Sequence, residues 1–491
     1  MKDDLVLVSN RGPVSFVEMD GQFQTKRGAG GLAGALDPVA RRLGDHAVWI
    51  ATATSDTDRD ALKSLSPETL EEELGYELRL LEIDPDVYDR YYNIVSNRML
   101  WFANHCLWDE IDEPAFGRRE LDAWADAYEP VNVTFAESVL DIAGPKALVV
   151  FQDYHLATAP GHLRDMGAKQ VIGHFTHSSF CGPAGLGRLP DPIPKRVIEG
   201  MLGADLLGFH VGHWAQNFYE CCRAVGASVD AQDGVVEHRS GRTWVRTYAI
   251  PIDPRDIHER VRGQRAREWA GRLLEDGRIL LVRADRAEPS KNIVRGFEAF
   301  GLLLDRREDL REKLHFVACL YPSRQEVPEY RRYTEDFRRA VDEVNARHPG
   351  SVDLFFWNDY DRTIGALSVY DALLVNPIID GMNLVAKEGP TANERDGVLI
   401  LSRGAGAFEE LGDYAVEIND PYDVIATAAA IERAIEMPAP DRRGRAEALR
   451  KIVDSRVPAD WIEAQLDDLT EIANGRAPLT PAPGDESEQA S

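Results

Sequence analysis

The stretch DALLVNPIIDGMNLVAKEG, residues 371–389, decides the fold class because an apolar run passes through a polar turn into a segment with helical spacing. The apolar run at 371–377 is short and nearly continuous, which is typical of a strand covered on both faces. Asp380 opens the turn, and the next three residues would offer backbone amides at a helix start: Gly381, Met382 and Asn383. This order predicts a βα unit with a ligand site at its turn.

The same alternation of apolar runs and amphipathic stretches continues through most of the chain. In the first half the runs are LVLVSN (5–10), HAVWIATA (46–53), ALVVFQ (147–152), QVIGHFTH (170–177) and DLLGFH (205–210). In the second half they are RILLVRA (278–284), LHFVACL (314–320), VDLFFW (352–357), DALLVNP (371–377) and VLILS (398–402). Short apolar strands separated by helices indicate an α/β fold with doubly wound parallel sheets. Two such series predict two Rossmann-like domains.

The domain boundaries follow from length and composition. The chain has 491 residues, more than one hydrophobic core usually holds. The proline-containing segment AIPIDPRDI (249–257) favours a linker near mid-chain, which gives a first domain at 1–250 and a second at 251–455. Residues 476–491 combine Pro, Ala and acids with little to bury, so we expect a disordered tail there.

The bulk composition disfavours several classes of protein. A formal net charge of −27 opposes a general affinity for nucleic acid or anionic lipid. No apolar stretch approaches the roughly 18 residues of a membrane span, and the N-terminus lacks a secretory pattern. We therefore expect a cytoplasmic protein with neither nucleic acid nor membrane as partner. The five cysteines lack zinc-type spacing, and no other motif indicates a metal.

Two cations follow the apolar run at 278–284. In RADRAEPSKN (283–292), Arg286 and Lys291 leave the carboxyl end of the expected strand, where open α/β sheets bind ligands. Arginine offers a planar fork and lysine a mobile charge, a combination that suits a diphosphate whose charge grows as it leaves. Taken alone, two cations on such a loop are more often solvated surface residues than ligands, by about two to one.

The polar turn after 371–377 also has two interpretations. Asp380 suits sugar hydroxyls, and Glu388, in the helix behind it, suits a ribose. Alternatively, Asp380 is a helix N-cap and both Lys387 and Glu388 are solvated, although this leaves the polar switch between two apolar strands unexplained.

Further candidates lie in the first half of the chain. The glycine-rich segment RGAGGLAGAL (27–36) could present amides to a phosphate or a sugar hydroxyl, or be a tight turn without a ligand. It matches neither the dinucleotide nor the P-loop spacing, which disfavours NAD binding and ATP hydrolysis. Four polar residues stand at strand ends: Asp153, His155, His174 and His177. We interpret His155 and His174 as structural, and His177 as the better ligand candidate.

Together these motifs resemble the trehalose-6-phosphate synthase family, the retaining transferases of glycosyltransferase family 20, in an actinobacterial-like variant with some pseudo-glycosyltransferase features. The resemblance runs from about Leu5 to Trp461. It is carried by VSNRGPVSF, GAGGLAGAL, YYNIVSNRMLW, FQDYHL, GHFTHSSF, RAEPSKN, DGMNLVAKE and SRGAGAFEELG. It implies a GT-B fold, with two Rossmann-like domains facing across a cleft and a C-terminal helix, here 456–475, that crosses back to the first.

The resemblance also implies site residues. The second domain would bind the nucleotide-sugar, with Arg286 and Lys291 as the diphosphate pair. The full donor set would be Gly31, Arg286, Lys291, Asp380, Gly381, Met382, Asn383, Leu384 and Glu388. The acceptor set would be Arg11, Tyr92, Trp101, Asp153 and Arg324. His177 resembles the family's histidine near the donor sugar. The implied catalytic residues are Arg286, Lys291, Asp153, His177 and Asp380, without a metal or other cofactor.

The implied reaction moves glucose from GDP-glucose or UDP-glucose to glucose 6-phosphate with retention, giving α,α-trehalose 6-phosphate. NERDGVLILS (393–402) also resembles pseudo-glycosyltransferases that use GDP-linked donors, which slightly favours GDP. The alternatives are another phosphorylated acceptor, such as a cyclitol phosphate or glycerol phosphate, and a non-catalytic sugar-phosphate sensor. The family commonly forms dimers or tetramers, so the resemblance implies a homodimer or homotetramer.

Three stretches depart from the family pattern. The loop RAEPSKN (286–292) replaces the usual Arg-Leu-Asp-Tyr-Ser-Lys-Gly and keeps both cations. A tryptophan expected after the strand around Trp49 is absent, and Thr52 stands near its place. The usual His-Ile-Pro-Phe-Pro is here HSSFC (177–181). The changes on the acceptor side bear on the identity of the receiving sugar.

Overall fold

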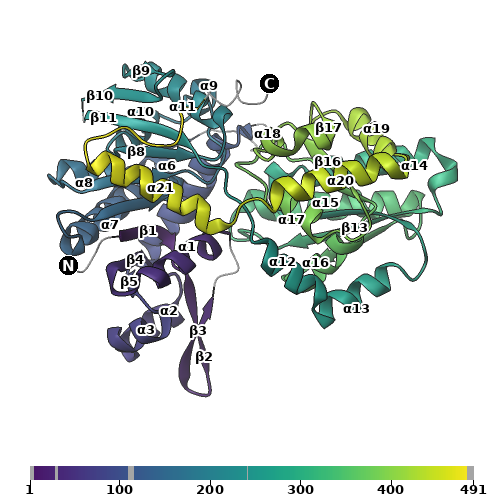
Figure 1. Ribbon diagram of the computed structural model, residues 1–491, viewed down its shortest axis with the longest axis horizontal. Coiled ribbons are helices and arrows are strands. Elements are labelled where there is room, and N and C mark those ends of the chain that lie inside the picture. The colour runs from purple at the N-terminus through teal and green to yellow at the C-terminus, as the bar shows by residue number, and fades with distance from the viewer. Residues whose placement is uncertain (1–4, 28–30, 109–115, 240, 484–491) are drawn as a thin grey trace. The chain divides into compact units, whose positions relative to one another are not determined.

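The computed structural model describes residues 5–27, 31–108, 116–239 and 241–483. The chain forms two compact units. Of the described residues, those up to 250 and from 458 onward form unit 1, and residues 251–457 form unit 2. The two units each have their own sheet (Figure 1).

Unit 2 has a parallel sheet of six strands in the order β14-β13-β12-β15-β16-β17. The strands are β12 (Ile279–Arg286), β13 (Leu314–Tyr321), β14 (Val352–Phe356), β15 (Ala372–Val375), β16 (Val398–Ser402) and β17 (Val416–Ile418). The order reverses between β12 and β15, because chain order runs outward from β12 in one direction and from β15 in the other. Loops at such a reversal point diverge and leave room for a ligand at the carboxyl ends of the strands.

Helices cover the faces of this sheet (Figure 1). They are α12 (Pro254–Arg262), α13 (Gln264–Leu273), α14 (Ile293–Arg306), α15 (Pro328–Arg347), α16 (Tyr360–Val369), α17 (Val385–Ala392), α18 (Phe408–Leu411), α19 (Val424–Ile435) and α20 (Ala439–Val453). The apolar faces of α14, α15 and α19 pack on the strands, and Phe297, Phe300 and Phe316 are fully buried in that core. Burial of strands on both faces explains why they read as continuous apolar runs.

Unit 1 has a sheet of nine strands in the order β5-β4-β1-β6-β7-β8-β11-β10-β9. The strands are β1 (Leu5–Arg11), β4 (Ala47–Thr52), β5 (Glu77–Leu81), β6 (Leu148–Gln152), β7 (Val171–Phe175), β8 (Leu206–Phe209), β9 (Ser228–Asp230), β10 (Val235–His238) and β11 (Gly241–Thr247). Pairing is parallel from β5 to β11, and β10 and β9 are antiparallel. The order reverses between β1 and β6, as it does between β12 and β15 in unit 2.

A hairpin of β2 (Val14–Met19) and β3 (Gln22–Arg27) follows the first strand of unit 1. Its turn is Asp20-Gly21, and both residues have positive φ, 53° and 75°. Glycine adopts this backbone without a steric penalty, and aspartate tolerates it. Most residues of β3 are exposed, so the hairpin carries no apolar run.

The helices of unit 1 are α1 (Gly31–Leu43), α2 (Asp56–Ser64), α3 (Pro67–Leu74), α4 (Pro85–Asp89), α5 (Trp101–Asn104), α6 (Arg118–Ala123), α7 (Glu129–Ile142), α8 (Ala159–Asp165), α9 (Pro183–Leu186), α10 (Ile193–Met201), α11 (Gly212–Ala224) and α21 (Pro458–Ala473). The last helix, α21, packs against α1 and reaches β6 and β7. A π-helical segment, η2 (Arg90–Leu100), joins α4 to α5. π-helical turns are often found at functional sites.

The expectation of a disordered tail is wrong for residues 476–483. The backbone amides of Leu479 and Thr480 donate to the Asp468 carboxylate at 2.6 and 3.0 Å, and Arg246 Nε donates to the Thr480 carbonyl at 2.7 Å. Asp468 is fully buried on α21. Composition did not predict this segment because its order depends on backbone hydrogen bonds to distant side chains rather than on its own apolar content. Residues 484–491 lie outside the described part of the chain.

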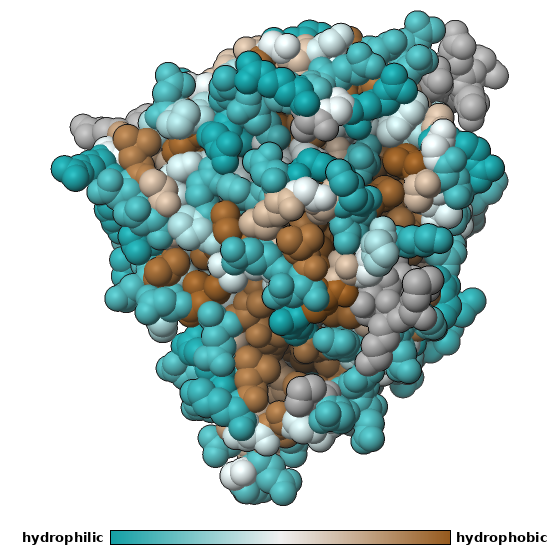
Figure 2. Space-filling model, turned by 90° about the vertical axis from the view of Figure 1, so that its left-hand side faces the viewer, coloured by the Kyte–Doolittle hydropathy of each residue, from teal (hydrophilic) through white to brown (hydrophobic). Residues whose placement is uncertain are grey.

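Within the described residues, no helix has both the length and the apolar character needed to cross a membrane. The face drawn in Figure 2 is mostly hydrophilic, with hydrophobic residues gathered toward its lower half. All five cysteines are free, and Cys106 alone among them is exposed.

Candidate active site

In unit 2, three of the residues predicted to bind the donor lie where the strand order reverses. Arg286 is the last residue of β12, and Lys291 ends the short 3-10 turn Pro289–Lys291 that follows it. Asp380 comes after the neighbouring strand β15. Lys291 and Asp380 form an ion pair in which the side chains are only 10% and 14% exposed.

A buried arginine holds the backbone of the turn that carries Lys291. Arg283 is fully buried, pairs with Asp285 at 2.7 Å and donates through Nη2 to the Lys291 carbonyl at 3.0 Å. Burial raises the pKa of Asp285 in spite of this partner. Gly296 leaves the space that the Arg283 guanidinium occupies, since a Cβ there would lie 2.4 Å from Nη1. The backbone that carries Lys291 is therefore held in one position.

The turn that begins at Asp380 is supported by the SRGAGAF segment. The Asp380 amide donates to the Gly404 carbonyl at 2.9 Å, and the Gly406 amide donates to the Asp380 carbonyl at 3.1 Å. A Cβ on Gly406 would lie 2.1 Å from the Gly381 carbonyl oxygen, and one on Gly404 would lie 2.1 Å from that of Ile378. Only glycine allows these two backbones to approach so closely.

The helix behind this turn starts later than the sequence suggested. It begins at Val385, so the amides of residues 381–383 belong to the loop before the helix rather than to its first turn. Asn383 caps it instead of Asp380: its Oδ1 accepts from the Ala386 amide at 3.1 Å, while its Nδ2 donates to Asp380 Oδ2 at 3.0 Å. Asn383 has φ of 76°, a backbone that asparagine tolerates better than most residues. The Asp380 carboxylate thus faces Lys291 and Asn383.

Glu388 lies one turn into α17, partly buried, and accepts a hydrogen bond from the Tyr360 hydroxyl at 2.9 Å. Burial raises the pKa of Glu388 to about 7, with Asp256 adding to the rise, although the Tyr360 hydrogen bond and Arg260 oppose it. The carboxyl therefore changes its charge near neutral pH. Lys387, beside it, is not solvated: it is 3% exposed and pairs with Glu410.

Glu288, which the sequence did not single out, sits between the cations of unit 2. Its Oε1 lies 3.0 Å from Arg286 Nη1 and 3.3 Å from Arg324 Nη1, and it accepts from Ser323 Oγ at 2.8 Å. Arg324, predicted to bind the acceptor, thus stands beside donor candidates in unit 2, whereas the other acceptor candidates are in unit 1. The sequence signal that could have identified Glu288 is an acidic residue between two basic ones in RAEPSK (286–291).

In unit 1, Arg11 and Asp153 mark the other reversal of strand order. Arg11 ends β1, and Asp153 follows β6, its parallel neighbour. Arg11 Nη2 donates to the Tyr92 hydroxyl at 3.0 Å, and the Tyr92 ring stacks on His155 at 5.7 Å. Asp153, with φ of 69°, accepts through Oδ1 from the amides of His177 at 3.2 Å and Ser178 at 3.4 Å. The polar ends of β1 and β6 thus form one cluster with η2.

Two of the histidines near Asp153, His174 and His177, are neutral. Burial lowers the pKa of His174 to about 4, and its Nε2 lies 3.2 Å from the Asp153 carbonyl. Burial also lowers the pKa of His177 well below the usual value, and neighbouring His210 adds to this. His177 Nε2 lies 2.8 Å from Gln152 Oε1, which orients the ring. A neutral imidazole in this position can exchange hydrogen bonds with a sugar hydroxyl but supplies no charge.

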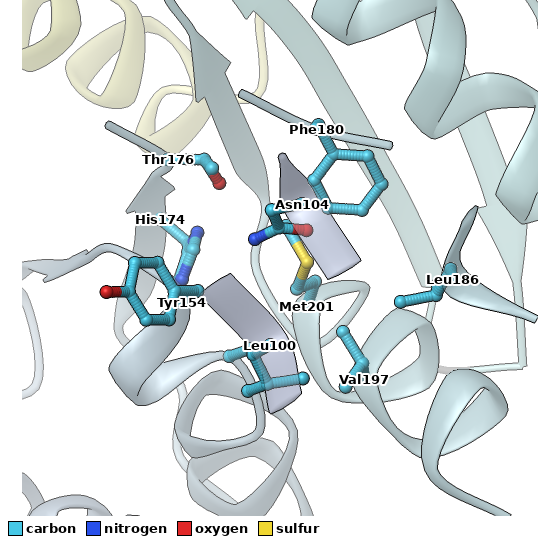
Figure 3. A pocket seen from close by; sticks show the side chains of 10 residues that line it. Leu100, Asn104, Tyr154, His174, Thr176, Phe180, Leu186, Val197 and Met201 are labelled. Carbon is cyan, nitrogen blue, oxygen red and sulfur yellow. The ribbon is translucent and has the colours of Figure 1, made fainter. Parts of the chain in front are cut away.

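A small pocket lies beneath this cluster (Figure 3). Its lining combines the polar side chains of His174, Thr176 and Asn104 with apolar ones such as Phe180 and Met201. Its free space of about 10 Å³ holds at most one water molecule, so it is no sugar site. His174 Nδ1 and Thr176 Oγ1, two polar atoms of its lining residues, have no hydrogen-bond partner among the described atoms.

The remaining sequence candidates fall into different positions. Trp101 is 3% exposed and stacks on His105 at 4.2 Å, so protein covers its ring. Thr52, which stands near the place of the family's tryptophan, lies opposite Arg11 in strand register. Gly31 begins α1, but residues 28–30 before it lie outside the described part of the chain. Met382 is buried and Leu384 partly buried in the loop before α17.

The sequence profile described as Glycosyltransferase family 20 matches residues 3–471. The chain belongs to glycosyltransferase family 20. Membership confirms both the suspected family and the α/β GT-B class, with its two Rossmann-like parallel-sheet domains. It also makes the chain a transferase rather than a binding module of another class.

Three proteins are similar to this family 20 chain over most of its length. It is 34% identical to a trehalose-6-phosphate synthase of Mycobacterium sp. (strain KMS), over 97% of each chain. It is 33% identical to a validamine 7-phosphate valienyltransferase of Streptomyces hygroscopicus subsp. jinggangensis, over 86% of this chain and 85% of the relative. The crystal structure of a UDP-forming α,α-trehalose-phosphate synthase from Burkholderia xenovorans, in complex with glucose-6-phosphate, aligns with a TM-score of 0.78 at 25% identity, over 95% of this chain and 99% of that one.

Proposed function

We propose that this family 20 glycosyltransferase moves glucose from a nucleoside-diphosphate-glucose to glucose 6-phosphate with retention of configuration, giving α,α-trehalose 6-phosphate. The observation that carries the proposal is the grouping of Arg286, Lys291 and Asp380 where the strand order of unit 2 reverses. Two cations suit the diphosphate, and a carboxylate beside them suits the hydroxyls of the sugar.

The chemistry requires charge stabilisation more than proton transfer. As the bond between the sugar C1 and the diphosphate oxygen breaks, negative charge grows on the diphosphate, and Arg286 and Lys291 would stabilise it. The new bond forms from the anomeric hydroxyl of the acceptor to C1 on the same face, and its proton goes to the departing diphosphate. The protein then acts by positioning and by electrostatics, without a covalent intermediate and without a metal.

In unit 1 the acceptor proposal rests on Arg11 and Asp153, and Arg324 is the acceptor candidate of unit 2 considered by itself. Arg11 is oriented by Tyr92 and could bind a phosphate through charge-assisted hydrogen bonds. Asp153 keeps one carboxylate oxygen on backbone amides, and its other oxygen faces His155 at 3.8 Å. The mycobacterial synthase and the glucose-6-phosphate complex among the relatives support glucose 6-phosphate as the acceptor.

The base of the donor is a separate question with two candidates. The UDP-forming relative from Burkholderia xenovorans supports UDP-glucose. The likeness of NERDGVLILS to the pseudo-glycosyltransferases supports GDP-glucose. A panel of UDP-, GDP- and ADP-glucose with glucose 6-phosphate distinguishes them, with nucleoside diphosphate release and disaccharide phosphate measured together. We expect one donor to be clearly preferred, and no disaccharide phosphate with any donor would overturn the proposal.

A cyclitol-phosphate acceptor is the second candidate function, because the valienyltransferase matches at an identity similar to that of the synthases. It should be tested by offering cyclitol phosphates and glycerol phosphate in place of glucose 6-phosphate, each at the same concentration with the preferred donor. A clear preference for one of these would replace glucose 6-phosphate in the proposal. Binding of sugar phosphates without any turnover would instead indicate a sensor.

The raised pKa of Glu388 predicts that donor binding depends on pH. If the ionised carboxylate accepts hydrogen bonds from the ribose, affinity should rise as the pH passes upward through about 7, where Glu388 loses its proton. A carboxyl with that pKa is about one-tenth ionised at about pH 6 and nine-tenths ionised at about pH 8, so we expect about a tenfold gain between them.

Calorimetric titration with the nucleotide-sugar measures this affinity, because its diphosphate, unlike a free nucleoside diphosphate, has no ionisation in the same range. The Glu388→Gln variant should bind with an affinity that no longer varies with pH. A wild-type affinity that is flat across the range would show that Glu388 does not take part as a carboxylate.

A further inference from the structure

We propose that Glu288 is a positioning residue that holds Arg286 and Arg324 in the orientations they need for phosphate binding. This inference rests on the function proposed above for the two arginines. Glu288 follows β12 and its side chain is 1% exposed. One carboxylate oxygen, Oε1, receives Arg286 from one side and Arg324 from the other, at 3.0 and 3.3 Å.

The surroundings of Glu288 suit this role. Ser323 donates to the same oxygen at 2.8 Å, which fixes the carboxylate itself. Arg324 lies in a loop and has a positive φ of 43°. Its Nη1 also donates a hydrogen bond to the Tyr330 hydroxyl. The Arg286 side chain is 56% exposed, so without a partner its many rotamers would be populated. A shared acceptor therefore sets the distance between two groups that would bind different phosphates.

The charges around Glu288 argue against a role in proton transfer. Burial by itself would raise the pKa of Glu288, but Arg286, Arg324 and Lys291 outweigh it and lower the pKa to about 2. The carboxylate therefore stays ionised at any physiological pH. With the buried Arg283–Asp285 pair included, four cations still outnumber the three carboxyl groups of Asp285, Glu288 and Asp380, so the region remains attractive to anions. We therefore explain the Glu288 carboxylate by the two arginine side chains that it orients.

The Glu288→Gln substitution tests the inference, since it keeps the shape and one acceptor oxygen but removes the charge. We expect kcat/KM to fall about 10- to 100-fold, the usual effect of losing charged hydrogen bonds, with a higher KM for both substrates. Glu288→Asp, which retains the carboxylate on a shorter stem, should recover part of the loss. In a variant that already carries Arg286→Ala and Arg324→Ala, adding Glu288→Gln should cost little more, because its effect passes through those side chains.

The matched control is Glu129→Gln in unit 1, where a carboxylate with 16% exposure pairs with His162 and Arg196. Glu129→Gln should leave both KM values unchanged even if it lowers the melting temperature as much as Glu288→Gln does. Unchanged KM values in Glu288→Gln, or a full additional loss in the background without the arginines, would overturn the inference. If the wild type is inactive and also binds no nucleoside diphosphate, the proposed function is wrong, and this inference, which rests on it, is wrong as well.

Discussion

Replacing Lys291 by alanine is expected to lower kcat/KM for the nucleotide-sugar about a thousandfold, which corresponds to about 4 kcal/mol of transition-state stabilisation. The Lys291 side chain is 10% exposed and lies against Asp380, where the strand order of unit 2 reverses. A charge in such a poorly solvated place acts strongly on a departing diphosphate, and water that enters the gap cannot replace it. The measurement is the initial rate of nucleoside diphosphate release at saturating acceptor.

Stability has to be followed in the same variant. Removing Lys291 takes from Asp380 its cation, although the Asn383 side-chain amide still donates to the carboxylate. A partly buried carboxylate without its cation lowers the free energy of unfolding. Rates should therefore be compared well below the melting temperature of the variant. Lys63→Ala is the control, because Lys63 is 64% exposed and pairs with Asp60 on the surface of unit 1. A kcat/KM within about threefold of wild type would mean that the diphosphate is bound elsewhere.

Replacing Arg286 by alanine should lower kcat/KM by about a hundred- to a thousandfold with little loss of stability. Its side chain is 56% exposed, and Glu288 keeps Arg324 and Ser323 as partners after the change. A loss of activity without a lower melting temperature would separate substrate binding from folding more cleanly than the Lys291 variant does. Steady-state kinetics and thermal melting on the same preparation measure both quantities.

Two further variants sharpen the Arg286 result. Arg286→Lys should recover only a small part of the activity, because an ammonium group lacks the planar fork that meets two phosphate oxygens at once. Arg339→Ala is the matched control, since Arg339 is 66% exposed and pairs with Asp336 on α15. Full activity in Arg286→Ala would remove this residue from the donor site, whatever the Lys291 variant shows.

The sequence predicted the central strands of both sheets because each is buried on both faces. The run at 314–320 became β13, Leu314–Tyr321, and the run at 398–402 became β16. Strands that are not buried on both faces were missed, such as β5, whose residues are all only partly buried, and the β2-β3 hairpin. The hairpin had a readable signal in its Asp20-Gly21 turn, which an apolar-run criterion does not detect.

The position of the candidate site followed from strand order, but its internal contacts did not. Residues after neighbouring parallel strands meet at one edge of a sheet, which is why Lys291 and Asp380 could be expected together. The roles of Glu288 and Asn383 depend on partners such as Arg324 and Ala386, which only the folded chain brings close. The later start of α17 has the same origin, because Asn383 rather than Asp380 caps it.

The proposed function is tested most directly by the product formed from glucose 6-phosphate and the preferred nucleotide-sugar, identified by NMR and compared between the wild type and Lys291→Ala. We expect α,α-trehalose 6-phosphate from the wild type, with one nucleoside diphosphate released per disaccharide, and formation about a thousandfold slower in the variant. A product with an inverted linkage, no disaccharide phosphate, or equal amounts from both proteins would contradict it.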